Sequence, residues 1–590
     1  MRIQGIGVSP GLASGKAVVL VSRATTIFRL PILPEDVDAE IHRLDEARVS
    51  ARRQIAELRE RVAKAVGRTY ARVFDAHLLM VEDAQLRADA EVIIRTERVN
   101  AEWALKTATE RLLAAFERIN DPYLRERGGD LEDVHSRLQR ALAGEKHRHE
   151  LSELTEDSVI VAHSLSPSDA GLLHQEHIVG FCTDVGTRTS HIAILANALS
   201  VPAVVGTHDL SRRVTGGDLL LVDGNTGEVL WRPSAQEREG YQRELIEFER
   251  HEQELDAERT LPAITLDGQA ITLMANIEFP EELGTALAQG ARGIGLYRSE
   301  FLYLSRAPAL PTEEEHLAVY DELASRCGGD EAIIRTFDLG GDKYFHEVME
   351  GGETNPVMGL RAIRFCLRRT DVFRTQLRAV LRASVHRNLK VMFPLVSGVG
   401  ELRQARALLE EARRELEKEG FQTNPDFKVG IMVEVPSAAL TADRLAQEAD
   451  FFSIGTNDLL QYSLALDRGN ESVSYLYQPL HPALLRLLQA IVAAGRAAGI
   501  DVSICGEMAG DPLAVPVLIG LGLHKLSMNA SAIAEVRSVV RQVEARRAEK
   551  VAAELLDLAT AEEVEARVRE EFRSVRSVRS RTPIERSDGP

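Results

Sequence analysis

Residues 451–467 read FFSIGTNDLLQYSLALD, a short apolar run of strand type followed by a polar turn and a helical pattern. The same alternation recurs from about residue 270 to about residue 530. The strand-type segments are AITLMANI (270–277), ARGIGLYR (291–298), AIIRTFD (332–338), LKVMFPL (389–395), VGIMVEVP (429–436), FFSIGTND (451–458), VSICGEM (502–508) and KLSMNA (525–530). Eight such units predict a (β/α)8 barrel of the TIM type, and an open doubly wound sheet is the structural alternative.

Charged, amide or thiol side chains end seven of these eight segments. In chain order the ends are Asn276, Arg298, Arg335 with Asp338, Pro394, Glu434, Asn457 with Asp458, Cys505 with Glu507, and Asn529. A single polar strand end is unremarkable, because strands finish near water. The carboxyl ends of barrel strands converge on one face, where enzymes of this fold carry their active sites. The pattern therefore predicts an active site on that face.

The side chains at these ends indicate the chemistry of the predicted site. Glu434 and Asp458 are oxygen ligands suited to Mg²⁺ that also binds a substrate phosphate. Four planar donors for a phosphate and a carboxylate are Arg298, Arg335, Arg361 and Arg468. The predicted ligand is thus small, doubly anionic and bound with a metal. Cys505 is either an acid or base for this ligand or a small buried apolar side chain.

A second candidate site lies at residues 186–191, which read GTRTSH between the β-rich HIVGFCTDV (177–185) and a helical pattern. His191 falls at the expected helix start, where unpaired backbone N–H groups and the helix dipole favour an anion. Hydroxyl residues and Arg188 surround it. The histidine is therefore either a phosphate acceptor or a packed residue behind a Ser/Thr cap.

Composition excludes several classes of protein. The four cysteines form no CxxC pair, which argues against a disulfide framework or structural zinc and favours a reducing cytoplasm. A formal net charge of −19 argues against general nucleic-acid binding. The longest apolar run, LAVPVLIGLGL from Leu513, is too short to span a membrane, and the N-terminus lacks the apolar region of a signal peptide.

The chain is too long for one core and divides into segments of different pattern. Residues 1–35 and 145–233 are expected to form one α/β domain, and the charged, glycine-poor segment 36–144 a helical bundle inserted into it. Residues 234–260 are polar on most faces and predict a helical linker, and 261–550 contain the barrel. Residues 551–590 predict a C-terminal helix and an Arg/Ser-rich, disordered tail.

Long motifs resemble those of a known family, the phosphoenolpyruvate-utilising enzymes. GTRTSHIAILANALSVPAVVG (186–206) resembles their phosphohistidine signature, and DFFSIGTNDLLQYSLALDRGN (450–470) resembles their second signature. Shorter matches are GIGLYRSEFLY, RTFDLGGDK, NPVMGLRAIR, MFPLVSGVGE, MVEVPSAA and CGEMAGDP. The order of phosphohistidine domain, inserted helices and barrel resembles Enzyme I of the sugar phosphotransferase system.

This resemblance implies a route for a phosphoryl group, from phosphoenolpyruvate to His191 with release of pyruvate, then to a histidine of the phosphocarrier protein HPr, driving sugar uptake. It implies that Arg298, Arg335, Arg361, Asn457, Arg468 and Lys343 bind phosphoenolpyruvate, that Glu434 and Asp458 bind Mg²⁺, and that Cys505 protonates the enolate. FDAHLLMVEDAQL (74–86) resembles the helices where HPr docks, and there we interpret His77 as a packing residue. A homodimer through the barrel is implied as well.

Three departures from the family pattern and three alternative functions remain. Thr187 stands where the family usually has glycine, Ala170 where a hydroxyl residue is common, and SMNAS (527–531) replaces SMSA, but no catalytic group is lost. One alternative is an enzyme like pyruvate phosphate dikinase or phosphoenolpyruvate synthase. It needs a nucleotide-binding domain for which the chain leaves no room, and no GxxxxGK[ST] loop occurs. The others are the nitrogen-regulatory paralogue of Enzyme I and a module that binds phosphoenolpyruvate without transferring phosphate.

Overall fold

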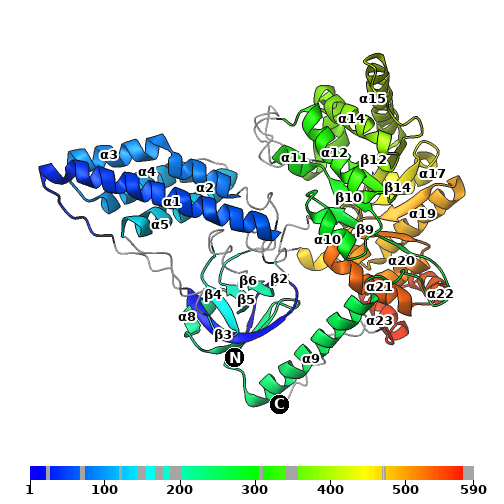
Figure 1. Ribbon diagram of the computed structural model, residues 1–590. Helices are drawn as coiled ribbons and strands as arrows, with labels where there is room; N and C mark the ends of the chain where they lie inside the picture. Colours follow the sequence, from blue (N-terminus) through cyan, green and yellow to red (C-terminus); the bar gives the residue numbers. More distant parts are fainter. Residues whose placement is uncertain are drawn as a thin grey trace. The chain divides into compact units, whose positions relative to one another are not determined.

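The computed structural model describes most of the chain, in two compact units, Met1–His251 and Glu252–Pro590 (Figure 1). The described residues are 1–20, 27–66, 73–118, 122–143, 154–165, 177–186, 196, 201–304, 310–338, 356–467, 470 and 473–575.

An eight-stranded sheet forms the base of the first unit, in the order β1-β8-β7-β3-β4-β5-β6-β2. The strands β3 to β6 run parallel to one another, and the others pair antiparallel. Their bounds are β1 (Arg2–Gln4), β2 (Ile6–Ser9), β3 (Leu12–Leu20), β4 (Ser158–Ala162), β5 (Ile178–Thr183), β6 (Ala203–Val205), β7 (Leu219–Asp223) and β8 (Glu228–Trp231). The short helix α8 (Leu210–Arg213) links β6 to β7.

Five helices are inserted between β3 and β4 and pack on one another (Figure 1). They are α1 (Val37–Val66), α2 (Val73–Glu82), α3 (Ala84–Glu97), α4 (Ala101–Arg118) and α5 (Pro122–Leu142). The apolar positions of α1 at three- and four-residue spacing are all buried: Ile41, Leu44, Ala51, Ile55, Leu58 and Val62. His77 of α2 is buried too, 3.3 Å from Asp130 and 3.6 Å from Asp133.

The helix α9 (Ala235–Glu258) follows the sheet, and its residues belong to the first unit up to His251 and to the second unit from Glu252. Near its start, the hydroxyl of Tyr241 lies 2.9 Å from the carbonyl of Ala13 on β3 and 2.6 Å from that of Val222 on β7. Near its end, Glu258 faces Arg541 of the second unit at 4.0 Å. The first turns of α9 are therefore fixed to the sheet by a buried hydroxyl.

The second unit is a closed barrel of parallel strands in the order β10-β11-β12-β13-β14-β15-β16-β9, which confirms the predicted barrel over the open sheet. The strands are β9 (Thr272–Ile277), β10 (Ile294–Arg298), β11 (Ala332–Arg335), β12 (Leu389–Phe393), β13 (Lys428–Val433), β14 (Phe451–Ile454), β15 (Asp501–Ile504) and β16 (Lys525–Met528). Each lies within one of the eight segments read from the sequence, apart from one-residue extensions at Lys428 and Asp501.

Helices surround the barrel and cover its outer apolar layer. They are α10 (Glu282–Ala288), α11 (Glu300–Leu304), α12 (Glu313–Cys327), α13 (Ala362–Arg368), α14 (Thr370–Ala383), α15 (Val399–Lys418), α16 (Pro436–Leu440), α17 (Ala442–Leu445), α18 (Thr456–Leu464), α19 (Pro482–Ala498), α20 (Val515–Gly520), α21 (Ile533–Gln542), α22 (Ala545–Leu555) and α23 (Ala561–Glu571). The last two pack against the barrel core through Val551 and Val568.

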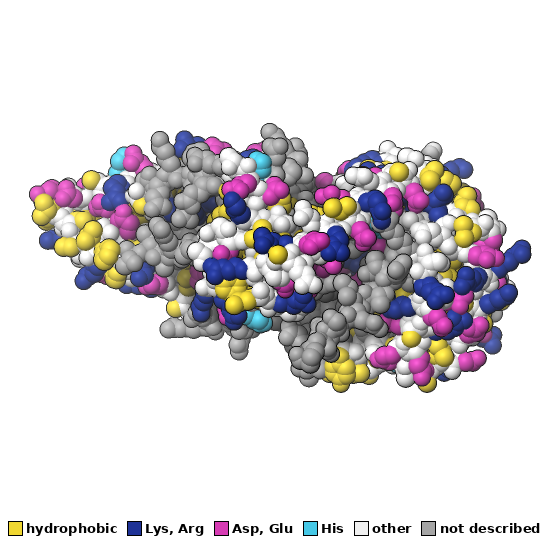
Figure 2. Space-filling model, turned by 90° about the horizontal axis from the view of Figure 1, so that it is seen from below, with side chains coloured by type: hydrophobic (Ala, Val, Ile, Leu, Met, Phe, Trp, Pro, Cys, Tyr) yellow, Lys and Arg dark blue, Asp and Glu magenta, His cyan; other side chains and the backbone are white. Residues whose placement is uncertain are grey.

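Charges of both signs are interspersed over the described surface seen in Figure 2. None of the helices in the described part of the chain is both long enough and apolar enough to cross a membrane.

The hydrogen bonds of the Tyr241 hydroxyl are expected to stabilise the first unit. Tyr241→Phe is expected to lower its free energy of unfolding by about 1–2 kcal/mol, because two buried carbonyls lose their shared O–H donor. Both tryptophans of the chain, Trp103 and Trp231, lie in this unit, so tryptophan fluorescence during urea unfolding reports on it alone. Tyr475→Phe, at a tyrosine that is 72% exposed, is the control and should leave the transition unchanged. If Tyr241→Phe and Tyr475→Phe unfolded at the same urea concentration, the stabilising role of the Tyr241 hydroxyl would be contradicted.

Candidate active site at the barrel mouth

Side-chain alternation along the strands points three of the predicted site residues into the barrel. Leu296, Ile333 and Met432 belong to the buried cluster that fills the barrel interior, together with Met392, Phe451 and Cys505. Arg298, Arg335 and Glu434 each lie two residues further toward the carboxyl end of the same strands. Because side chains alternate with a period of two, these groups emerge on the inner face just above the apolar layer.

Two arginines share one buried carboxylate at this mouth. Asp338 accepts from Arg335 at 2.8 Å and from Arg361 at 2.9 Å, and it is only 3% exposed. Glu300 lies 3.1 Å from the other terminal nitrogen of Arg335. Burial alone would lower the pKa of Arg335, but the carboxylates of Glu300, Asp338 and Glu434 raise it above its usual value. Both guanidinium groups are therefore held charged and oriented inside the protein.

Glu434 is buried directly after β13 in a setting that disfavours its negative charge. Burial, followed by the charges of Asp458 and Asp338, raises the pKa of this carboxyl well above its usual range. The backbone N–H of Leu395 donates to Oε1 at 2.6 Å, and Leu395 adopts a left-handed φ of 56° to do so. A Cβ on Gly455 would lie 2.8 Å from Oε2. The surrounding backbone is thus shaped around this carboxylate.

The sixth barrel strand, β14, is shorter than the segment 451–458 from which it was predicted. β14 stops at Ile454, and Asn457 and Asp458 lie in the first turn of α18. The side chain of Asn457 donates to Glu507 at 3.0 Å and accepts from the Glu507 backbone N–H at 3.0 Å. Asp458 lies 3.8 Å from Arg361. The turn therefore brings Asp458 into the arginine cluster while Asn457 faces the loop after β15.

Cys505 is both packed and close to the charged groups. It is 4% exposed within the interior cluster, and its thiol lies 3.6 Å from the Ile454 carbonyl. Its own carbonyl accepts from the amide of Asn276 at 2.9 Å. Burial raises the pKa of Cys505 to about 11. The thiol therefore carries its proton at neutral pH.

The structure brings seven of the predicted site residues to one end of the barrel: Arg298, Arg335, Arg361, Glu434, Asn457, Asp458 and Cys505. Arg298 is paired with Glu278. His191, Lys343 and Arg468 lie outside the described residues, as do Thr187 and Ala170.

Comparisons with known proteins match nearly the whole chain. Residues 4–127, 154–227 and 252–545 match the N-terminal, mobile and PEP-binding domains of the PEP-utilising enzymes. Proteins named phosphoenolpyruvate-protein phosphotransferase from Geobacillus stearothermophilus and Bacillus subtilis (strain 168) are 42% and 41% identical, over 97% of this chain and 98% and 100% of theirs. A solved structure titled Enzyme I (nEIt) is 37% identical over 42% of this chain and 99% of its own, with a TM-score of 0.37.

This chain belongs to the phosphoenolpyruvate-protein phosphotransferase family. The resemblance indicated by the two long signatures is thereby confirmed. The family members matched here are transferases, and the predicted class of enzyme is confirmed as well.

The described residues of this protein offer few side chains as ligands for a metal ion. Within the described ranges no group of three or more His, Cys, Asp or Glu side chains is arranged as metal ligands. Glu434 and Asp458 are nevertheless neighbouring carboxylates, and the charge of Asp458 adds to burial in raising the pKa of Glu434. Two carboxylates fit Mg²⁺, which keeps several waters and takes further ligands from a bound phosphate.

Sequence reasoning missed several residues that shape this site. Asp338 ends one of the strand-type segments, but nothing in the spacing of the sequence shows that it forms ion pairs with two arginines. Glu300 follows Arg298 by two positions in GLYRSEFLY, so the motif itself was the available signal. Gln376 and Ser299, described below, contact the backbone of the Arg335 loop and were not recognised.

Burial of the cysteines predicts low thiol reactivity in the native family member. All four thiols are buried, and burial raises the pKa of Cys327 and Cys505 to about 11. At pH 8 the native protein is expected to react slowly with dithionitrobenzoate, and the rate should rise with pH beyond 10. The same protein in urea should release four equivalents at once. A native thiol that titrates rapidly near its ordinary pKa would contradict this assignment.

Proposed function

We propose that this protein transfers the phosphoryl group of phosphoenolpyruvate to its own His191, releases pyruvate, and passes the phosphoryl group to a histidine of HPr. The observation that carries the proposal is the barrel mouth itself. It gathers Arg298, Arg335 and Arg361 beside the carboxylates Glu434 and Asp458 and a protonated thiol. Cationic and anionic groups of this kind suit a small, metal-bound phosphate ester of a carboxylic acid.

The arginines bind and orient the substrate in this proposal. Phosphoenolpyruvate carries a phosphate and a carboxylate, and a guanidinium can donate two parallel hydrogen bonds to either group. Asp338 holds Arg335 and Arg361 with their forks already oriented, so little side-chain entropy is lost when an anion binds. Asn457, Arg468 and Lys343 are assigned to the same substrate by the family motifs.

The carboxylates of Glu434 and Asp458 would hold Mg²⁺. When bound, the metal supplies positive charge that stabilises the phosphoryl oxygens and neutralises the repulsion between the two carboxylates. The N–H of Leu395 and the missing side chain of Gly455 keep the Glu434 carboxylate in place for this role.

The reaction balances as an in-line transfer followed by one protonation. The P–O bond of phosphoenolpyruvate breaks as a P–N bond forms on a nitrogen of neutral His191, with the arginines stabilising the charge on the equatorial oxygens. The leaving enolate takes a proton at its methylene carbon from the Cys505 thiol and becomes pyruvate. The thiolate then regains a proton from water. Because the thiol is protonated at neutral pH, it is ready to act as the acid.

The remaining parts of the chain have roles in the second transfer. HPr is proposed to dock on the inserted helices α1 to α5, where His77 is buried and serves packing. Since His191 precedes α9 and the substrate site follows it, α9 must permit the histidine to reach both partners. A cytoplasmic location and a homodimer through the barrel domain belong to the same proposal.

The central test follows labelled phosphate from phosphoenolpyruvate. With Mg²⁺ and purified HPr, the label is expected on this protein as acid-labile phosphate and then on HPr. His191→Ala should abolish both, because the acceptor nitrogen is gone. Labelling of His191→Ala would show that another residue accepts the phosphate. Labelling by ATP without phosphoenolpyruvate would favour the dikinase alternative.

Replacing the proposed acid should separate the two transfers. Cys505→Ala is expected to slow pyruvate formation by about 10²–10⁴-fold, the usual contribution of a positioned general acid. Exchange of phosphate between His191 and phospho-HPr should be unaffected, because it needs no enolate protonation. Cys366→Ala, at a buried cysteine on α13 outside the interior cluster, is the matched control for loss of a thiol. Equal loss of both transfers would contradict the role of Cys505.

A further inference from the structure

A buried amide lies behind the arginine site, on the inner face of α14. Gln376 is fully buried, and its neighbours on this face are apolar: Val372, Phe373, Leu377 and Val380. A buried primary amide is costly unless its polar atoms are paired. Two of the three hydrogen bonds of Gln376 lead toward the loop that follows β11, and the third goes to Tyr320 of α12.

The hydrogen bonds of Gln376 leave no choice of orientation. The backbone N–H of Phe337 can only donate, so the atom facing it at 3.0 Å must be the amide oxygen. The amide nitrogen then donates to Ser299 at 2.9 Å and to Tyr320 at 3.0 Å. Because Ser299 Oγ accepts from the amide, its own proton goes to the carbonyl of Arg335 at 2.8 Å.

These bonds hold the two peptide groups that flank Thr336. Thr336 lies in the sequence between Arg335 and Asp338, the two charged residues of the site. The β11–β12 ladder still reaches the Thr336 N–H, which donates to Met392 at 3.0 Å. Beyond that point Gln376 binds the N–H of Phe337, while Ser299 binds the C=O of Arg335. The backbone that carries Arg335 and Asp338 is therefore fixed from the helix layer as well as from the sheet.

The far end of the chain of hydrogen bonds is anchored in α12. The hydroxyl of Tyr320 accepts from Gln376 and lies 3.0 Å from Nδ1 of His316, which is fully buried. Burial lowers the pKa of His316 to about 4, so the ring is neutral, and its Nδ1 and the Tyr320 hydroxyl form one hydrogen bond. The hydrogen bonds thus run from Gln376 through Tyr320 to His316 on α12.

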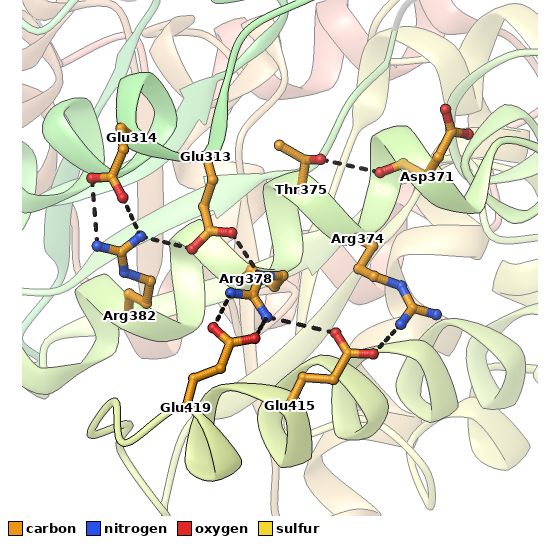
Figure 3. Close-up of polar contacts among 9 residues, drawn as sticks. All are labelled: Glu313, Glu314, Asp371, Arg374, Thr375, Arg378, Arg382, Glu415 and Glu419. Carbon is orange, nitrogen blue, oxygen red and sulfur yellow. Dashed lines mark hydrogen bonds and ion pairs between the residues drawn. The ribbon is translucent and has the colours of Figure 1, made fainter.

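The outer face of the same helix is fixed by ion pairs (Figure 3). Arg378 contacts Glu313 of α12 at 2.6 Å and Glu419 after α15 at 2.7 Å, and Arg382 contacts Glu313 at 2.7 Å. Arg374 is paired with Glu415 of α15. The helix that carries Gln376 is therefore tied on both sides, which limits how far the amide can shift.

We infer that Gln376 is a positioning residue for phosphoenolpyruvate binding, acting through the Arg335 carbonyl and the Phe337 N–H to aim Arg335 and Asp338 at the substrate. The inference rests on the proposed function of this site. Gln376 does not itself reach the barrel mouth, so it works only by setting the geometry of the loop. Since the loop holds the Asp338 that orients Arg361, a shift would misplace two substrate-binding guanidinium groups at once.

The test compares Gln376→Met with the wild-type protein in steady-state pyruvate formation. Methionine keeps the length of the side chain but removes the acceptor for Phe337 and the donor for Ser299. The KM for phosphoenolpyruvate is expected to rise about 10- to 100-fold, the scale of a small displacement of substrate-binding groups. Phosphate exchange between His191 and phospho-HPr should stay at the wild-type rate, because it does not use this loop.

Two further variants keep the result interpretable. Ser299→Ala removes the bond to the Arg335 carbonyl and one acceptor of the Gln376 amide but leaves the bond between Gln376 and Phe337. It should therefore raise KM in the same direction by a smaller factor, even if Gln376→Met folds poorly. Ser384→Ala is the control, since its buried hydroxyl accepts from the Asn424 N–H just before β13 begins, at the end of that strand opposite the barrel mouth. It should lower thermal stability without changing KM.

The outcomes separate this inference from the proposed function. If Gln376→Met and Ser299→Ala lose thermal stability but keep the wild-type KM, the residues are structural only and the inference is overturned. If the wild-type protein itself forms no pyruvate from phosphoenolpyruvate, the proposed function fails instead. A raised KM in both variants, with unchanged KM in Ser384→Ala, supports the positioning role.

Discussion

The carboxylate of Asp338, shared by Arg335 and Arg361, is the interaction on which the proposed substrate site depends. Burying a guanidinium without a counterion is prohibitive, and a buried pair is favourable only when its geometry is well satisfied. Asp338 meets that requirement for two arginines with one side chain, at 2.8 and 2.9 Å. The Nε–H groups of both guanidinium groups are buried and have no hydrogen-bond partner among the described residues. They can be directed at an anion in the mouth of the barrel.

Groups from several elements hold the Asp338 carboxylate in position. The strand β11 ends at Arg335, and the next residues leave the sheet, so the ladder alone cannot fix Asp338. The amide of Gln376 and the hydroxyl of Ser299 take over the backbone groups that the sheet no longer pairs. Glu300 adds a second carboxylate to Arg335 from the start of α11. The site is thus built from the sheet, the helix layer and the loops together.

The barrel could be predicted from the sequence because its strands and helices follow local patterns of apolar residues. Eight apolar runs with helical patterns between them predicted all eight strands, although the segments extend up to four residues past the strand ends. The polar strand ends predicted that Arg298, Arg335 and Glu434 lie at one end of the barrel. The early end of β14 was missed, since Gly455 is needed there for the approach of Glu434, a contact between different strands. The partners of Asp338, Glu434 and Gln376 were missed for the same reason, because barrel closure alone brings such distant positions together. His191, by contrast, was found by motif, and its surroundings remain a prediction.

The balance of charge at the mouth explains why a metal belongs to the proposed chemistry. The described groups comprise three guanidinium groups, Arg298, Arg335 and Arg361, and five carboxylates, Glu278, Glu300, Asp338, Glu434 and Asp458. With all of them ionised, the carboxylates exceed the guanidinium groups, and the field repels an anion such as phosphoenolpyruvate. Burial raises the pKa of Glu434 most, and the charges of Asp458 and Asp338 raise it further. A divalent cation held by Glu434 and Asp458 would cancel this excess of two negative charges, so in the proposed function the metal and the substrate would each favour the binding of the other. In the proposed function the arginines would orient the anion, and the cation would make the site attractive to it.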